Sequence, residues 1–296
     1  MLAEQLQKHG FQIDFVDPPK IPIRNLKNPS FVITSSVSSF FKGSYDIVHA
    51  FNVPSTFAMR MTRAKKRVLS IHGVFSDQIN ALHSSALGGI AGVTEESVLK
   101  WADALTTDSK ASQKAYKEKL GLDFAYMPSP IDATKFQDLG DVDKKENQIA
   151  YIGRDSYEKG IDILRQIEPK IKGKVVYSTN LPWKEAMRLL KSSSIVVIPS
   201  RMESLPTVVK EAFYLKVPVI ATTVGGIPEL VINGTTGILI PPENPEKLLE
   251  EINNLLQNKE YAKKLADAAY DFVVNNMTWD TILPKYVKFY ESLLKS

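Results

Sequence analysis

The sequence of 296 residues contains no cysteine and no long apolar run, and both absences narrow its function. Without cysteine, disulfides, thiolate metal sites and a cysteine nucleophile are excluded. No apolar run approaches the roughly 18 residues of a membrane-spanning helix, and the amino terminus lacks the apolar core of a secretory signal. We therefore expect a cytoplasmic protein. No G-x-G-x-x-G follows a strand-like run, which argues against a nicotinamide-dependent dehydrogenase.

The charge balance is mild, with 37 Lys and Arg against 33 Asp and Glu and a net charge of +4. We expect no nucleic-acid partner. The densest basic cluster consists of Arg60, Arg63, Lys65, Lys66 and Arg67. Near an anionic lipid surface each such residue contributes about 1 kcal/mol. We favour a solvated helix end followed by a strand, and peripheral contact with the inner face of a membrane is the alternative.

Helix-like and strand-like segments alternate along the chain, which is typical of an α/β protein with parallel sheets. Helices are expected at 2–9 and 279–294, and also from near Gly160, Pro182, Pro206, Pro228 and Pro245. The expected strands are 11–16, 46–50, 67–71, 104–107, 124–127, 149–152, 174–178, 195–198, 217–222 and 237–240.

A polar stretch at 137–147 reads as a linker between two such sets of segments. The predicted domains are therefore residues 1–140 and 147–278, each a doubly wound Rossmann-like unit. In folds of this kind ligands bind outside the carboxyl ends of the strands. We expect the ligand in the crevice between the two domains.

Two glutamates, Glu203 and Glu211, lie eight positions apart around a predicted strand-to-helix turn. Pro206 suits the first position of the helix, since its missing N–H would have no partner there. The unpaired amides of that turn form a seat for phosphate between the two carboxylates. This arrangement suits a nucleotide-sugar, which has an anionic diphosphate between two hydroxyl-rich rings. The amides belong to the turn around Leu205, Thr207 and Val208.

This segment resembles the E-x7-E signature of the retaining GT4-family glycosyltransferases, which have the GT-B fold. The resemblance continues through 217–222, 225–231 and 237–242, and is strongest over 149–242. It implies two Rossmann-like domains facing across a cleft, with a terminal helix in 279–296 crossing back to the first domain. The family normally opens with a strand and a glycine-rich loop, whereas this sequence begins at the following helix. We therefore expect the first domain to lack both.

A second motif, Gly153-Arg154 followed by Lys159-Gly160, resembles the diphosphate loop of the same family. Arginine forks onto phosphate oxygens, and lysine adds a compact point charge. Fixed cations stabilise the charge that develops on a leaving nucleoside diphosphate, so we expect no metal and no other cofactor. The pair Asp141 and Asp143 resembles a D-x-D metal site, but it lies in the charged linker and is expected to be solvated.

The resemblance also implies roles for single residues. Glu203 would bind hydroxyls of the transferred sugar, and Glu211 the ribose hydroxyls. His72 follows the predicted strand 67–71, where the family places a histidine that faces the donor sugar. His49 matches another recurrent position, and there we expect packing.

The predicted function is retaining transfer of a sugar from a UDP- or GDP-sugar to a lipid, polysaccharide or small-molecule acceptor. An alternative is a non-catalytic glycosyltransferase-like protein that binds a nucleotide-sugar or assists a partner. A nucleotide-sugar epimerase is a third possibility within the fold. The sugar, the base and the acceptor are not specified by the residues.

Overall fold

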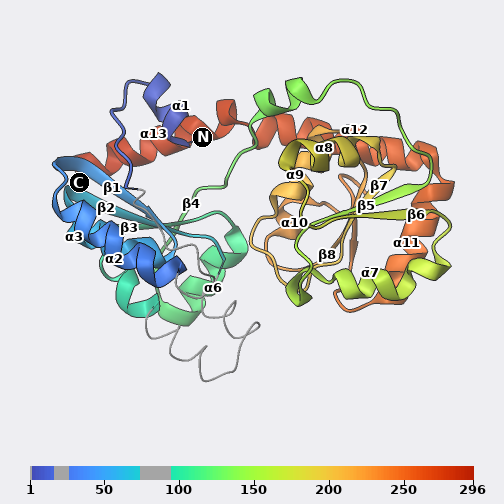
Figure 1. Ribbon diagram of the computed structural model, residues 1–296, viewed down its shortest axis with the longest axis horizontal. Coiled ribbons are helices and arrows are strands. Elements are labelled where there is room, and N and C mark those ends of the chain that lie inside the picture. Colours follow the sequence, from blue (N-terminus) through green and yellow to red (C-terminus); the bar gives the residue numbers. More distant parts are fainter. Residues whose placement is uncertain (1, 17–26, 74–94) are drawn as a thin grey trace. The chain divides into compact units, whose positions relative to one another are not determined.

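The computed structural model describes residues 2–16, 27–73 and 95–296. The chain divides into two compact units, and each is considered by itself (Figure 1). The first unit comprises residues 1–128 and 283–296, and the second comprises residues 129–282. Each contains a parallel sheet with helices against it. The predicted α/β class with two parallel-sheet domains is confirmed.

The sheet of the first unit has the strand order β1-β2-β3-β4, and all neighbours are parallel. Its strands are β1 (Ser44–Phe51), β2 (Arg63–Ile71), β3 (Ala104–Thr107) and β4 (Ala125–Tyr126). Its helices are α1 (Leu2–Lys8), α2 (Lys27–Phe40), η1 (Val53–Ser55), α3 (Thr56–Met61), α6 (Lys110–Leu120) and most of α13 (Trp279–Lys295). The core includes Leu69 and Ile71 of β2, together with a stacked pair of Tyr116 and Phe124.

The sheet of the second unit has the order β6-β5-β7-β8-β9, again parallel throughout. Every residue of β7 and β8 is buried, as expected for β-branched runs covered by helices on both faces. The strands are β5 (Gln148–Ile152), β6 (Lys174–Ser178), β7 (Ile195–Ile198), β8 (Val219–Thr222) and β9 (Ile238–Ile240).

The remaining helices of the second unit alternate with these strands, which is the pattern predicted from the sequence. They are η2 (Ala133–Leu139), η3 (Tyr157–Lys159), α7 (Ile161–Ile167), η4 (Glu168–Lys170), α8 (Trp183–Ser192), α9 (Thr207–Tyr214), α10 (Ile227–Leu230), α11 (Pro245–Gln257) and α12 (Lys259–Asn276).

One predicted strand is wrong: residues 11–16 form neither helix nor strand. Their apolar and polar residues alternate, as in a half-buried strand, but no backbone ladder forms. The segment is held by side chains instead. Phe11 lies against the ring of Tyr290, and the hydroxyl of Tyr45 donates to Asp14 at 2.6 Å.

The segment predicted as a linker packs on the second unit. Leu139 is completely buried in that unit's core, and the amide of Lys145 donates to the carbonyl of Ser192 at 2.8 Å. Just before this segment, the amide of Ile131 donates to Met277 O at 2.8 Å. Residues 129–140, which the sequence placed with the first domain, therefore belong to the second unit.

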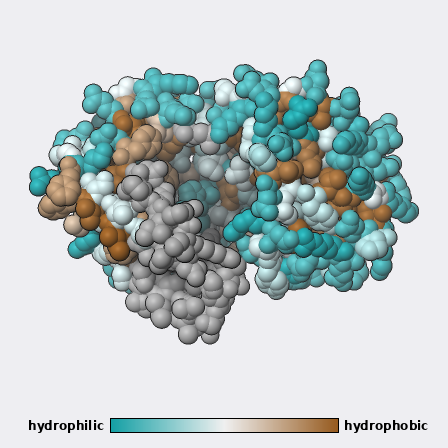
Figure 2. Space-filling model, viewed as in Figure 1, coloured by the Kyte–Doolittle hydropathy of each residue, from teal (hydrophilic) through white to brown (hydrophobic). Residues whose placement is uncertain are grey.

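The surface of α2 has an unusual distribution of side chains. Its buried face carries Ser35 and Ser39, whereas Ile33, Val37 and Phe40, together with Phe41 just after the helix, are exposed. Figure 2 shows hydrophobic residues gathered over this helix. Within the described residues, no helix has both the length and the apolarity to cross a bilayer. The residues of this apolar face, each more than half exposed, are Ile33, Val37, Phe40 and Phe41.

Candidate functional site

Two of the predicted site residues meet at the carboxyl ends of neighbouring strands in the second unit. Lys159 lies in the loop after β5 and Glu203 in the loop after β7, and β5 and β7 pair in parallel. The ammonium group of Lys159 donates to Oε1 of Glu203 at 2.8 Å, and Ser200 Oγ donates to the same oxygen at 2.8 Å. The Glu203 side chain is only 8% exposed. The two motifs thus form one polar site.

Glycine brings the first of these loops close to β7. Gly160 has a φ of 64°, and a Cβ atom there would lie 1.9 Å from the carbonyl oxygen of Pro199. In the same region the amide of Arg201 donates to Glu158 O at 2.9 Å. Only glycine allows this approach without a shift of the backbone. The Lys-Gly pair of the motif therefore places Lys159 beside the β7 loop.

A second glycine supports Glu203 from the other side. Gly225 has a φ of 52°, and a Cβ atom there would lie 1.8 Å from the carbonyl oxygen of Glu203. The next amide, that of Gly226, donates to Ser204 O at 2.7 Å. The pair Gly225-Gly226 therefore holds the loop that carries Glu203.

Sequence reasoning did not single out Arg201, which connects three loops of this site. Its guanidinium pairs with Asp162 through bonds of 2.7 and 2.8 Å, bonds to Glu243, and lies 3.9 Å above the ring of Tyr157. The hydrogen bonds that Arg201 donates, first to Asp162 and then to Glu243, raise its pKa. The sequence signal for Arg201 was its position shortly after β7, because its partners Asp162 and Glu243 follow other strands of the same sheet.

Arg154 is not joined to the two glutamates. Its guanidinium pairs with Glu158 at 2.9 Å, and its side chain is 71% exposed. Within the described residues it makes no contact with Glu203 or Glu211. The backbone before it is fixed, since the amide of Gly153 donates to Ser178 O at 3.1 Å. The structure therefore brings Lys159, and not Arg154, to Glu203.

The predicted helix after Glu203 is α9, and it begins one residue later than expected. Pro206 is its N-cap, and α9 starts at Thr207. The first-turn amides of a helix have no intrahelical partner. Proline offers no side-chain acceptor, so no side chain of the N-cap binds them here. Leu205 and Pro206 are buried, Thr207 is exposed and Val208 is half-buried. The first turn of α9 thus reaches the surface at Thr207 and Val208.

Glu211 lies in the second turn of α9, where its side chain accepts a hydrogen bond from Trp183. Nε1 of Trp183 donates to Oε1 of Glu211 at 2.7 Å. Burial raises the pKa of Glu211, and the Trp183 bond together with the charges of Lys210 and Lys135 opposes that rise.

His72 belongs to the first unit, directly after β2. Its Nδ1 lies 2.9 Å from Oδ2 of Asp108, and its side chain is 34% exposed. Asp108 follows β3, and the register that pairs Ile71 with Thr107 places the two residues side by side. The carboxylate favours a proton on Nδ1. Asp108 was not among the predicted residues, and its signal was its place after an adjacent parallel strand.

His49 lies inside the first unit, in a chain of polar side chains. Its Nδ1 contacts the hydroxyl of Tyr290 at 2.6 Å, and its Nε2 contacts Ser70 Oγ at 2.6 Å. Ser70 in turn contacts Thr106 at 2.5 Å. Burial lowers the pKa of His49 to about 3, with a smaller contribution from the charge of His72. The residue is therefore neutral and connects α13 to the sheet.

The parts of the chain that the structure describes hold no group of three or more His, Asp or Glu side chains arranged for a metal ion. Asp141 and Asp143, the D-x-D look-alike, are both exposed.

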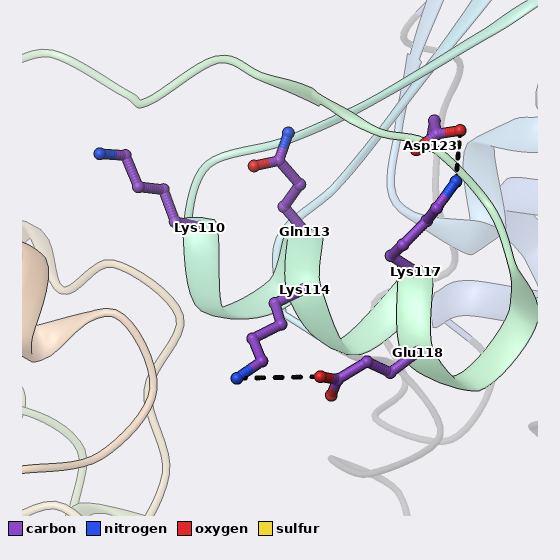
Figure 3. Close-up of a pocket in the computed structure, with 6 residues that line it drawn as sticks. All are labelled: Lys110, Gln113, Lys114, Lys117, Glu118 and Asp123. Carbon is purple, nitrogen blue, oxygen red and sulfur yellow. Dashed lines mark hydrogen bonds and ion pairs between the residues drawn. The ribbon is translucent and has the colours of Figure 1, made fainter.

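A shallow hollow of about 350 Å³ lies beside α6 in the first unit and contains none of the predicted site residues (Figure 3). Lys117 pairs with Asp123 at 2.7 Å, and Lys114 lies 3.8 Å from Glu118. These carboxylates neutralise two of its lysines, which makes it a poor anion site. The six residues that line it are Lys110, Gln113, Lys114, Lys117, Glu118 and Asp123.

Comparison with known proteins shows which sequences and structures this chain resembles. The family model described as Glycosyl transferases group 1 matches residues 167–272. An uncharacterized glycosyltransferase of Methanocaldococcus jannaschii is 22% identical over 98% of this chain and 92% of its own. The structure of sucrose-phosphate synthase from Thermosynechococcus elongatus superposes with a TM-score of 0.80, at 19% identity, over 99% of this chain and 92% of its own.

A further solved structure, Anabaena HepE in complex with UDP-glucose, has a TM-score of 0.69 at 18% identity and covers 98% of this chain and 88% of its own. At such identities the solved structures establish the fold. The family model and the archaeal relative support glycosyl transfer as the class of activity. Residues 167–272 therefore match the model of the glycosyl transferases group 1 family, in a chain whose fold is that of the GT-B glycosyltransferases.

Proposed function

We propose that this protein transfers a sugar from a UDP- or GDP-sugar to a lipid, polysaccharide or small-molecule acceptor, with retention of anomeric configuration. The observation that carries the proposal is the Lys159–Glu203 pair, 2.8 Å apart, beside the open start of α9. A cation, a carboxylate and unpaired amides together suit a diphosphate joined to a hydroxyl-rich ring. The UDP-glucose held by the structurally similar HepE is consistent with such a donor.

In this proposal the diphosphate binds to Lys159 and to the amides at the start of α9. These groups stabilise the negative charge of the leaving nucleoside diphosphate where it develops. Arg154 is exposed and pairs with Glu158. It reaches the phosphate by exchanging that carboxylate for a phosphate oxygen. Because the cations are fixed in the protein, we propose that no metal ion is required.

The remaining roles follow the family resemblance. Glu203 accepts hydrogen bonds from hydroxyls of the transferred sugar, and Glu211 from the ribose. His72, oriented by Asp108, is the residue of the first unit that we assign a role in transfer. We retain two competing functions, a non-catalytic nucleotide-sugar-binding protein and a nucleotide-sugar epimerase, as outcomes of the experiment below.

The experiment compares wild-type protein with Glu203→Gln and with a control, Glu260→Ala, on the exposed surface of α12. Calorimetry with UDP- and GDP-sugars finds the donor, and nucleotide release with candidate acceptors measures turnover. We expect Glu203→Gln to lower turnover by about 100-fold or more while the protein stays folded, because it removes a charged acceptor at the reacting sugar. The control should keep full activity.

Undiminished turnover in Glu203→Gln would reject the assignment of this residue. Donor binding by wild-type protein without nucleotide release would favour the non-catalytic alternative. A donor that is converted to its epimer with no acceptor would favour the epimerase. The anomeric configuration of the product, read by NMR, tests retention.

We also propose that the first unit contacts anionic membrane surfaces. Of the basic cluster, Arg60 and Arg63 are exposed, while Lys65 pairs with Asp46 at 2.7 Å and is partly neutralised. Arg60 belongs to α3, against which α2 packs. A helix that presents apolar residues beside basic ones suits the boundary between headgroups and acyl chains. The occupant we assign to this face is therefore an anionic bilayer.

A further inference from the structure

Trp183 contacts the one carboxylate of the site that is expected to bind ribose. It is the first residue of α8, and its Nε1 donates to Oε1 of Glu211 at 2.7 Å. The indole is 37% exposed, so its ring lies at the surface of the second unit. Nothing in the motif comparison assigns a role to Trp183.

The indole ring is held in place from several directions. Phe136 meets it edge-on, with ring centroids 5.2 Å apart, and the ammonium group of Lys135 lies 5.9 Å from its centroid. Phe136 itself packs against Tyr214 of α9, with centroids 4.7 Å apart. The segment that carries Trp183 is thus fixed to the same helix as Glu211. A rigid donor of this kind orients its acceptor at little cost in entropy.

The bond from Trp183 leaves the second oxygen of Glu211 as the acceptor for a ligand. A carboxylate oxygen has two lone pairs, and the two hydroxyls of a ribose can share one carboxylate. Correct orientation of the carboxylate plane decides whether both hydroxyls are reached. We propose that Trp183 is a positioning residue that sets Glu211 for a ribose diol, and so makes the site select ribonucleoside over 2′-deoxyribonucleoside diphosphates. This inference rests on the proposed function.

The surrounding charges define how the effect depends on pH. The groups that act on the Glu211 carboxylate are Trp183, Lys210 and Lys135, and all three favour its ionised form against burial. Removal of the indole N–H takes away the first of these contributions. The pKa of Glu211 must then rise, and the acid limb of ribonucleotide binding moves to higher pH.

The test is calorimetry on the full chain with UDP, GDP and ADP, followed by the 2′-deoxy analogue of the nucleotide that binds best. We compare wild type with W183F, E211Q and the double variant, and W101F in the first unit is the matched control. In wild type we expect the 2′-deoxy analogue to bind about tenfold more weakly. W183F should weaken ribonucleotide binding by about five- to tenfold and the 2′-deoxy analogue much less. W101F should change neither.

Two further readouts separate positioning from simple packing. The double variant should bind no more weakly than E211Q alone, since both changes act on one interaction. W183H, which retains a ring N–H, should restore part of the selectivity. Equal weakening for both nucleotides in W183F, or additive losses in the double variant, would overturn the inference. If wild type binds none of the three diphosphates, the proposed function fails and takes this inference with it.

Discussion

The two units of this protein organise their site residues in different ways. In the second unit, backbone contacts place the site: Gly160 and Gly225 allow loops to pass within carbonyl contact of Pro199 and Glu203. In the first unit, side chains do so: Asp108 orients His72, and His49 joins Tyr290 to the sheet. Backbone contacts leave glycine and proline signatures in a sequence, whereas side-chain contacts between distant residues leave weaker signals, such as the place of Asp108 after a strand parallel to β2. The site residues of the second unit were therefore easier to predict from the sequence.

The largest expected effect comes from adding a side-chain atom at Gly225, where the backbone contacts that of Glu203. Gly225→Ala places a Cβ atom 1.8 Å from a backbone oxygen at a φ of 52°. We expect the second unit to lose about 3–5 kcal/mol of unfolding free energy, and turnover to fall with it. The matched control is Gly121→Ala in the first unit, where φ is 68° and no atom lies within 4 Å of the added Cβ. It should cost only the backbone strain, about 1–2 kcal/mol.

Urea unfolding, followed by the hydrogen-exchange protection of each unit, measures both variants. Similar losses for the two alanines would show that backbone strain alone matters and that contact with Glu203 O does not. The contrast between backbone-built and side-chain-built sites would then lose its strongest support.

A smaller loss of stability, confined to the first unit, is expected when the pH is lowered. The pKa of His49 is lowered to about 3 in the folded protein, from an ordinary 6.5. The unfolded chain therefore takes up a proton that the folded one refuses. The stability due to His49 is complete above pH 6.5 and decreases by roughly 1.4 kcal/mol per unit as the pH falls toward 3. The measurement is the protection of β1 and β2 amides against pH.

The variant His49→Phe serves as the control, because a neutral ring keeps the stack on Phe51. It should reduce stability at neutral pH, because the buried Tyr290 hydroxyl loses its bond to His49, yet flatten the pH slope. An unchanged slope would assign the acid sensitivity to other groups. Equal sensitivity in the second unit would remove the difference between the two.

The smallest effect on stability is expected on the exposed face of α2. Replacement of Ile33, Val37 and Phe41 by serine should change unfolding free energy by about 0.5 kcal/mol or less, because the side chains already face solvent. The same change should reduce retention on phosphatidylglycerol vesicles several-fold. Phosphatidylcholine vesicles provide the baseline, and Ser36→Ala on the same helix is the control variant. Unchanged retention, or a dimer in light scattering that the serines abolish, would contradict the membrane proposal.

Much of the second unit could be predicted because its signals are local. The β-branched run at 195–198 became β7 with its predicted limits, and the fold class followed from the alternation of such runs. Pro206 marked the start of α9 within one residue. The alternation at 11–16 predicted a strand that does not form. A strand also needs the edge of a partner strand, which a local pattern does not supply. Leu139, in a polar stretch, was missed for a similar reason: its burial depends on helices far along the chain.

The sequence by itself determined the two α/β units and the motifs around Lys159, Glu203 and Glu211, since these depend on residue types at short, fixed spacings. Only the tertiary structure decided which of these residues touch. Register and loop approach joined Lys159 to Glu203, turned Arg154 toward Glu158, and gave Glu211 its bond from Trp183. The physical reason is range: propensity and periodicity act over a few residues, whereas a hydrogen bond between loops is set by the packing of the whole sheet.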